Sequence, residues 1–219
     1  MSLLPYIEVA TGDKPGASVI WLHGLGADGH DFEPIVPELK LAKEHAVRFI
    51  FPHAPKIPVT INGGMVMPAW YDILDMNINR KVDNEQLQAS ADAVIKLVEQ
   101  ELARGIPSEQ IFLAGFSQGG AVAYQAALSF DKPLGGLLAM STYLATAETV
   151  HLHPQNRDIQ VMVMHGSQDP VVPEQLGQAA SAFLQKNNYS HEYKTYPMPH
   201  SVCAEQIGDI STWLQQRIK

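Results

Sequence analysis

The sequence has little of several features that mark specialised classes of protein. Its 219 residues include one cysteine, Cys203, so no disulfide can form within the chain. Only 17% of the residues are charged and 8% are aromatic, and no apolar run approaches the ~20 residues that span a membrane. The N-terminus also lacks a basic segment followed by a long apolar run. We therefore expect a cytoplasmic protein with no stable membrane insertion.

Positive charge is scarce as well. Asp and Glu number 23 against 15 Lys and Arg, which gives a formal net charge of -8. No local cluster of Lys and Arg offsets this charge, so nucleic acid is not an expected partner. The chain does have 46% hydrophobic residues, which is enough to build a sizeable core in a single domain over 1–219.

Apolar segments alternate with helical patterns along the chain. Continuous apolar runs predict buried strands, and alternation of polar and apolar residues predicts a less buried strand at 191–196. The predicted strands are 18–23, 47–51, 111–114, 136–140, 160–164 and 191–196, and the predicted helices are 32–39, 83–104, 118–129, 174–185 and one marked by Ile207, Ile210 and Leu214. This order predicts an α/β fold with a mostly parallel central sheet and helices on both faces.

Two longer stretches lack a regular pattern. Residues 52–79 contain four prolines, Gly63 and Gly64, and several apolar side chains. We expect this stretch to be irregular and too apolar for a solvated linker, which is typical of a functional segment. Residues 142–157 are expected to form a loop.

A serine bracketed by glycines joins the predicted strand at 111–114 to the predicted helix at 118–129. The segment Gly115-Phe116-Ser117-Gln118-Gly119 has the Gly-x-Ser-x-Gly form of a nucleophile elbow. In such a turn, glycines avoid collision with the neighbouring strand and helix, and the helix directs free N–H groups and its positive end at the serine. The motif alone also fits an ordinary glycine turn, so its function depends on partner residues.

A serine hydroxyl needs a histidine to take its proton and a carboxylate to orient that histidine. In a parallel sheet these groups gather beyond the carboxyl ends of the strands, in the chain order serine, acid, histidine. Asp169 comes directly after the predicted strand at 160–164, and His200 follows the strand at 191–196. His165 is too close in sequence to Asp169 to face it easily. The sequence therefore predicts Ser117, Asp169 and His200 as catalytic residues.

A glycine-rich loop at 23–29 follows the first predicted strand. The tetrahedral oxyanion of acyl transfer needs two hydrogen-bond donors. The elbow template assigns these to the backbone N–H groups of Leu25 and Gln118. A metal site on His23 and His30 is disfavoured because no third ligand stands at a suitable spacing, and no metal or cofactor is expected.

Several motifs, in order over nearly the whole chain, resemble the carboxylesterase and acyl-protein thioesterase family of α/β-hydrolases. They are His23-Gly24-Leu25-Gly26-Ala27-Asp28-Gly29, Pro52-His53-Ala54-Pro55, Pro58-Val59-Thr60, Asn62-Gly63-Gly64, Trp70-Tyr71-Asp72-Ile73, the serine motif, Gly166-Ser167-Gln168-Asp169 and His200. The resemblance implies an α/β-hydrolase fold without a separate lid domain, with Ser117, Asp169 and His200 as triad. It also implies ester or thioester substrates with acyl chains, or lysophospholipids.

The same resemblance implies that residues 57–74 form an apolar wall over the acyl group. Trp70 is expected nearest the substrate, with Met65 and Val66 also in contact with it. A tryptophan of the core is an equal alternative for Trp70, and the segment fits a homodimer contact equally well. The segment at 198–203 departs from the glycine-bearing turn of the eukaryotic thioesterases, which favours a carboxylesterase similar to those of bacteria.

The leading hypothesis is a serine carboxylesterase that forms an acyl-enzyme from a small-molecule or lipid-like acyl ester. An acyl-protein thioesterase or a lysophospholipase is the alternative in the same class. A catalytically silent α/β-hydrolase that serves as a binding module is the alternative from a different class.

Overall fold

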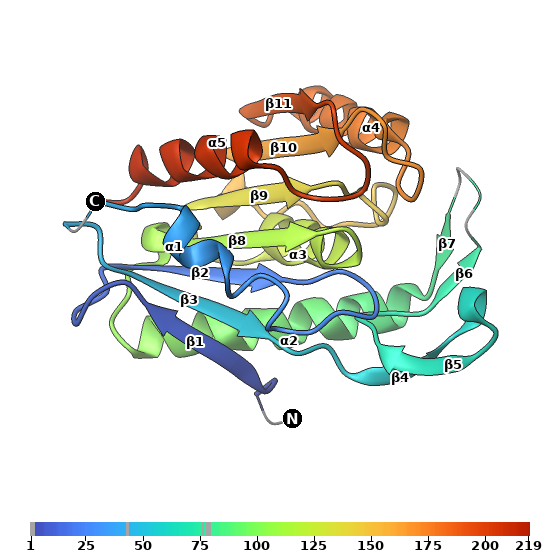
Figure 1. Ribbon diagram of the computed structural model, residues 1–219, viewed down its shortest axis with the longest axis horizontal. Helices are drawn as coiled ribbons and strands as arrows, with labels where there is room; N and C mark the ends of the chain where they lie inside the picture. The colour runs from blue at the N-terminus through green and yellow to red at the C-terminus, as the bar shows by residue number, and fades with distance from the viewer. Residues whose placement is uncertain (1–2, 43, 76, 78–79) are drawn as a thin grey trace.

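The computed structural model describes residues 3–42, 44–75, 77 and 80–219, and a seven-stranded sheet lies at its centre (Figure 1). The strands run in the order β1-β3-β2-β8-β9-β10-β11. Their bounds are β1 Tyr6–Ala10, β2 Ala17–Leu22, β3 Val47–Pro52, β8 Ile111–Phe116, β9 Gly136–Met140, β10 Val161–Gly166 and β11 His191–Tyr196. Every neighbouring pair is parallel except β1 and β3. The predicted mostly parallel sheet is confirmed.

Burial of the strands follows their sequence patterns. Every residue of β2, β9 and β10 is buried, as expected for apolar strands covered on both faces. The edge strand β11 is only partly buried, in agreement with its alternating pattern. The other edge strand, β1, was not predicted. It is short and half-exposed and pairs antiparallel with β3, so it lacks the continuous apolar run that marks the central strands.

Helices pack on both faces of the sheet. On one face, α2 Asn84–Ala103, α3 Gln118–Ser129 and α4 Glu174–Lys186 cover a core that includes Ile20 and Leu113. On the other face, α1 Ile35–Glu38 and α5 Ala204–Gln215 cover Val19 and Phe112. The helix expected at 32–39 is shorter than predicted: Pro37 cannot donate to the carbonyl of Glu33, which prevents an earlier start, and the positive φ of Lys40 ends the helical conformation. No helix in the described ranges is both long enough and apolar enough to cross a membrane.

The stretch at 52–79 is not irregular, so that prediction is wrong for the residues that the structure describes, which exclude 76, 78 and 79. It contains one small hairpin, β4 Lys56–Val59 with β5 Met65–Pro68, and the first strand of a second, β6 Ile73–Asp75, which pairs with β7 Lys81–Val82 just beyond it. The short helical turn η1 Thr60–Asn62 and two glycines at positive φ connect β4 to β5. Prolines are tolerated in these strands because two-stranded ribbons leave many N–H groups unpaired.

The hairpins lie beyond the carboxyl ends of β2, β3 and β8 (Figure 1). The predicted loop at 142–157 is also found, with one short turn, η3 Pro154–Asn156. The described residues include no separate lid domain. The hairpins and this loop therefore stand in the place where an α/β sheet carries its functional groups.

A buried ionic cluster joins β1, β3 and α2. The carboxylate of Glu101 is fully buried and accepts hydrogen bonds from Arg48 at 2.7 Å and from Arg104 at 3.1 Å. Both arginines also contact Glu8 of β1, at 3.3 Å and 2.7 Å. A buried charge of this kind is costly unless its partners are present.

We predict that Glu101→Ala lowers the free energy of unfolding by about 3–5 kcal/mol, because it leaves two arginines without their shared buried partner. Urea denaturation would measure this change. Glu99→Ala, on an exposed position of the same helix, is the matched control and should change stability by less than about 0.5 kcal/mol. Equal stability of the two variants would show that the cluster contributes nothing net.

Candidate active site

Ser117 lies at the sharp turn between β8 and α3. Its φ of 54° and ψ of -122° are unusual for a residue with a side chain. Neighbouring hydrogen bonds hold this conformation, because the Ser117 N–H donates to Met140 O at 2.9 Å and the Thr142 hydroxyl donates to Ser117 O at 2.6 Å. This is the strained strand-to-helix turn that exposes a nucleophile in an elbow.

The two glycines of the motif stand where side chains do not fit. A Cβ on Gly115 would lie 2.5 Å from Gly119 O, and a Cβ on Gly119 would lie 2.5 Å from His23 O. Any residue other than glycine at position 119 would therefore keep α3 farther from the end of β2. This contact brings the start of α3 next to the glycine-rich loop at 23–29.

Asp169 and His200 are hydrogen-bonded to each other. The distance from His200 Nδ1 to Asp169 Oδ2 is 2.6 Å. The other carboxylate oxygen of Asp169 accepts the N–H groups of Val171 and Val172, both at 2.8 Å. Since a carboxylate only accepts, Nδ1 of His200 carries the proton and Nε2 is left as the basic nitrogen of the ring.

Ser117 and His200 line the same cavity, which has a volume of about 270 Å³. Leu25 and Gln118 line it too, so four of the residues predicted from the sequence meet there with Asp169 directly behind His200. No hydrogen bond joins the Ser117 hydroxyl to His200 among the described residues. Catalytic hydrogen bonds often tighten only when substrate binds.

The backbone N–H groups predicted as oxyanion donors belong to Leu25 and Gln118, which both line the Ser117 cavity. Gln118 is the first residue of α3, where helical N–H groups have no partner within the helix. In the part of the chain that the structure covers, the Leu25 N–H has no acceptor, although the next N–H along, from Gly26, donates to Pro68 O. Both residues border the Ser117 cavity, as the elbow template requires.

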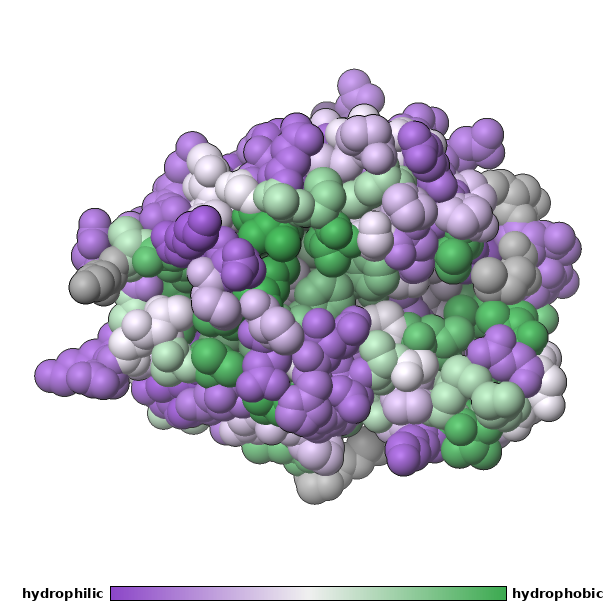
Figure 2. Space-filling model, in the orientation of Figure 1, coloured by the Kyte–Doolittle hydropathy of each residue, from purple (hydrophilic) through white to green (hydrophobic). Residues whose placement is uncertain are grey.

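The residues predicted to contact substrate in 57–74 do not line the Ser117 cavity, and the surroundings of Trp70 match the alternative of a core tryptophan. Trp70 is 1% exposed and does not line the cavity, because its indole Nε1 donates to His23 O at 2.8 Å within the core. Met65 and Val66 are 63% and 64% exposed at the start of β5 and do not line the cavity. Figure 2 shows apolar surface over this end of the molecule. The segment contributes Ile61 and Ile73 to the cavity instead.

Seven other residues line the cavity that were not predicted from the sequence as parts of the site. They are Arg80, Tyr143, Val171, Phe116, Gly24, Ala27 and Asp31. Most lie in loops and belong to no periodic pattern, so the available signal was their closeness in sequence to predicted site residues. Val171 is two residues after Asp169, and Phe116 directly precedes Ser117.

The side chain of Gln118 has a structural role that its sequence position did not reveal. Its Oε1 accepts a hydrogen bond from the backbone N–H of Trp70 at 2.9 Å, and its Nε2 donates to the backbone carbonyl of Tyr71 at 2.6 Å. Gln118 thereby fixes the segment before the second hairpin against the elbow.

Two buried histidines support the site without lining the cavity. Burial lowers the pKa of His23 and of His165, which favours their neutral forms. His23 Nδ1 donates to Gly24 O at 2.7 Å and its Nε2 accepts the Ala54 N–H at 3.1 Å. Among the described residues, no group of three His, Cys, Asp or Glu is placed to hold a metal ion.

His165 is nearer to Asp169 than its sequence position suggested. Its Nε2 lies 3.7 Å from Asp169 Oδ2 and donates to Val172 O at 2.8 Å. No hydrogen bond joins the two side chains in the part of the chain that the structure describes, and Asp169 Oδ2 is bonded to His200 instead, so His165 is not the hydrogen-bond partner of Asp169. His165 braces the short turn that carries Asp169.

Comparisons with known proteins identify the family and support the fold of this chain. Residues 5–218 match the family described as Phospholipase/Carboxylesterase. Acyl-protein thioesterase 1 of Gibberella zeae is 37% identical over 213 residues, which cover 92% of this chain and 91% of that protein. A probable carboxylesterase of Oryza sativa subsp. japonica is 36% identical over 99% of this chain and 84% of its own length. The crystal structure of Zea mays acyl-protein thioesterase 2 is similar with a TM-score of 0.87 and 26% identity, covering 98% of this chain and 99% of that one.

We predict opposite effects for two Gly→Ala substitutions. Gly119→Ala should lower the free energy of unfolding by about 1–3 kcal/mol or more, because its Cβ collides with the backbone of Leu22 and His23. Gly208→Ala, on an open and exposed position of α5, should raise it by up to about 1 kcal/mol through helix propensity. Urea denaturation of both variants would test this. A Gly119→Ala protein as stable as the parent would refute the close contact at the elbow.

Proposed function

Because the chain belongs to the phospholipase/carboxylesterase family of α/β-hydrolases and is a serine ester hydrolase, we propose that Ser117 is its nucleophile. His200 is the general base in this proposal, and Asp169 orients His200. The observation that supports it most is the convergence of Ser117 and His200 on one cavity, with Asp169 bonded to the far side of the imidazole ring at 2.6 Å.

The proposed reaction begins when Ser117 Oγ attacks the carbonyl carbon of the substrate. The hydroxyl proton passes to His200 Nε2, and the resulting imidazolium is stabilised by Asp169. The oxyanion accepts hydrogen bonds from the N–H groups of Leu25 and Gln118, which do not have to reorient to meet it. His200 then gives its proton to the leaving oxygen or sulfur, and the acyl group remains on Ser117.

Water completes the cycle by the reverse sequence of proton transfers. His200 takes a proton from the attacking water, a second oxyanion forms in the same place, and the Ser117 oxygen recovers a proton as the acid leaves. The two N–H groups that hold the Asp169 carboxylate keep the histidine in one orientation throughout. No metal or cofactor is needed for any of these steps.

The proposed substrates carry an apolar acyl group. Leu25, Ile61, Ile73 and Phe116 supply apolar walls next to Ser117. The substrate can be a thioester or an oxygen ester. We favour a thioester, since relatives from Gibberella zeae, Cryptococcus neoformans and Neurospora crassa are named acyl-protein thioesterase 1. An oxygen ester is the second candidate, supported by the probable carboxylesterase of Oryza sativa.

We predict that the protein hydrolyses an octanoyl thioester with a kcat/KM at least equal to that for the matched oxygen ester. Ser117→Ala should lower kcat for both by at least about 10⁴-fold, because the nucleophile is lost. A fluorophosphonate probe should label the parent and Ser167→Ala, a serine outside the cavity, but not Ser117→Ala. Folded protein that takes up no probe would favour the silent binding module, and a higher kcat/KM for the oxygen ester would favour the carboxylesterase.

A second prediction concerns the Leu25 donor. Leu25→Pro removes the backbone N–H and should lower kcat by about 10²–10³-fold, whereas Leu25→Ala keeps the N–H and should stay within about tenfold of the parent. Steady-state kinetics would measure both, with circular dichroism to confirm that each variant is folded. Equal kcat values for folded Leu25→Pro and Leu25→Ala would rule out Leu25 as an oxyanion donor.

A further inference from the structure

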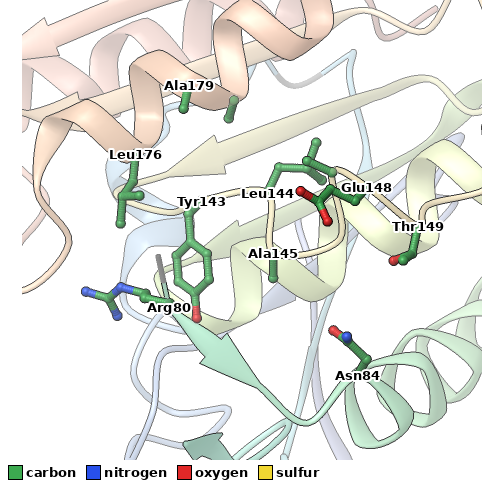
Figure 3. Close-up of a pocket in the computed structure, with 11 residues that line it drawn as sticks. Arg80, Asn84, Tyr143, Leu144, Ala145, Glu148, Thr149, Leu176 and Ala179 are labelled. Atoms are coloured by element: carbon green, nitrogen blue, oxygen red, sulfur yellow. The ribbon is translucent and has the colours of Figure 1, made fainter. Parts of the chain in front are cut away.

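A second cavity lies next to the Ser117 cavity and is larger. This accessory cavity has a volume of about 580 Å³, against about 270 Å³ for the Ser117 cavity. Figure 3 shows it between the start of α2, the loop after β9 and one side of α4. Small-molecule sites usually have volumes of about 300–1,000 Å³, so the accessory cavity is in this range and the Ser117 cavity is slightly below it.

Arg80 and Tyr143 line both cavities, and among the described residues they are the two that do so. In Figure 3 their side chains lie side by side, with Leu176 and Ala179 of α4 near them and Asn84 and Thr149 on the opposite side of the cavity. The two side chains therefore form the partition between the cavities.

Tyr143 is the fixed half of this partition. It is 5% exposed, and its hydroxyl is hydrogen-bonded at 2.9 Å to the hydroxyl of Tyr71, which is fully buried. Tyr71 is in turn held through its backbone carbonyl by the Gln118 side chain at 2.6 Å. The position of Tyr143 is thus linked to the elbow itself.

Arg80 is the other half, and it spans a gap between two segments. Its guanidinium carbon lies 5.0 Å from the centre of the Tyr143 ring, a distance typical of a cation–π contact. Its Nη2 donates a hydrogen bond to Val171 O, in the turn that carries Asp169. The side chain thereby connects the second hairpin to the loop after β10 across the edge of the Ser117 cavity.

We propose that Arg80 determines the acyl-chain length that this enzyme accepts, by closing the path from the Ser117 cavity into the accessory cavity. The proposal rests on the function inferred above for Ser117. A short acyl chain fits within the Ser117 cavity, whereas a long one meets the guanidinium. Beyond Arg80, the side chains of Leu144, Leu176 and Ala179 offer apolar surface to a chain that passes the partition, whereas Asn84, Glu148 and Thr149 make the rest of the lining polar.

Removal of the Arg80 side chain should therefore favour long acyl chains. Each methylene that leaves water for an apolar site improves binding by roughly fourfold. In Arg80→Ala, we expect the ratio of kcat/KM for a dodecanoyl ester to that for a butanoyl ester of the same leaving group to rise by about tenfold or more. Steady-state kinetics on the butanoyl, octanoyl and dodecanoyl esters would measure this ratio.

Three further variants make the test specific. Arg157→Ala removes a comparable arginine that lines neither cavity. The guanidinium carbon of Arg157 lies 5.7 Å from the centre of the Tyr189 ring, and its loss should leave the ratio unchanged. Adding Ala179→Trp to Arg80→Ala fills the accessory cavity and should return the ratio toward the parent value. Arg80→Lys, with a narrower head group, should give a smaller rise and replaces the alanine variant if that variant does not fold.

Two results would overturn the proposal. One is an unchanged ratio in folded and active Arg80→Ala or, in its place, Arg80→Lys. The other is a raised ratio that Ala179→Trp does not reduce.

If the parent hydrolyses none of the esters, the proposed function fails separately. Calorimetric binding of dodecanoic acid to the parent and to Arg80→Ala then tests the role of Arg80 as a partition. Binding at least tenfold tighter in Arg80→Ala supports the partition, and equal binding refutes it.

Discussion

The contact between the start of α3 and the end of β2 is the constraint on which the site depends. The two backbones approach so closely at Gly119 that no Cβ fits between them. This contact places the first N–H of α3 beside the loop that carries Leu25, and hydrogen bonds with Met140 and Thr142 hold Ser117 in its unusual backbone conformation at the same turn. A wider spacing between α3 and β2 would separate the two proposed oxyanion donors, so their geometry depends on the glycine at 119.

The sequence predicted the central sheet and the proximity of Ser117, Asp169 and His200, because both depend on strong local signals. The buried strands are continuous apolar runs, and α3 spans the predicted 118–129. Asp169 and His200 were found because residues after parallel strands share one end of the sheet. The roles of these residues remain proposals, whereas their proximity is observed.

The remaining features were not predictable because they depend on long-range packing. Trp70 was expected at the substrate, but nothing in its local sequence shows that its indole donates to His23 O across the core. The hairpins at 56–82 were read as irregular because their prolines mask the strand pattern. The fully buried Glu101 fits the helical pattern of α2 but gives no sign of its two arginine partners.

The position of His200 after an edge strand has a consequence for how the site responds to heat. Ser117 follows the central strand β8, whereas His200 follows β11, which pairs on one side only. Edge strands open locally at a lower free energy than the centre of a sheet. Opening of β11 would take the histidine away from Asp169 while the nucleophile, its helix and the oxyanion loop stayed in place. We therefore expect heating to abolish activity at a temperature at which most of the protein is still folded.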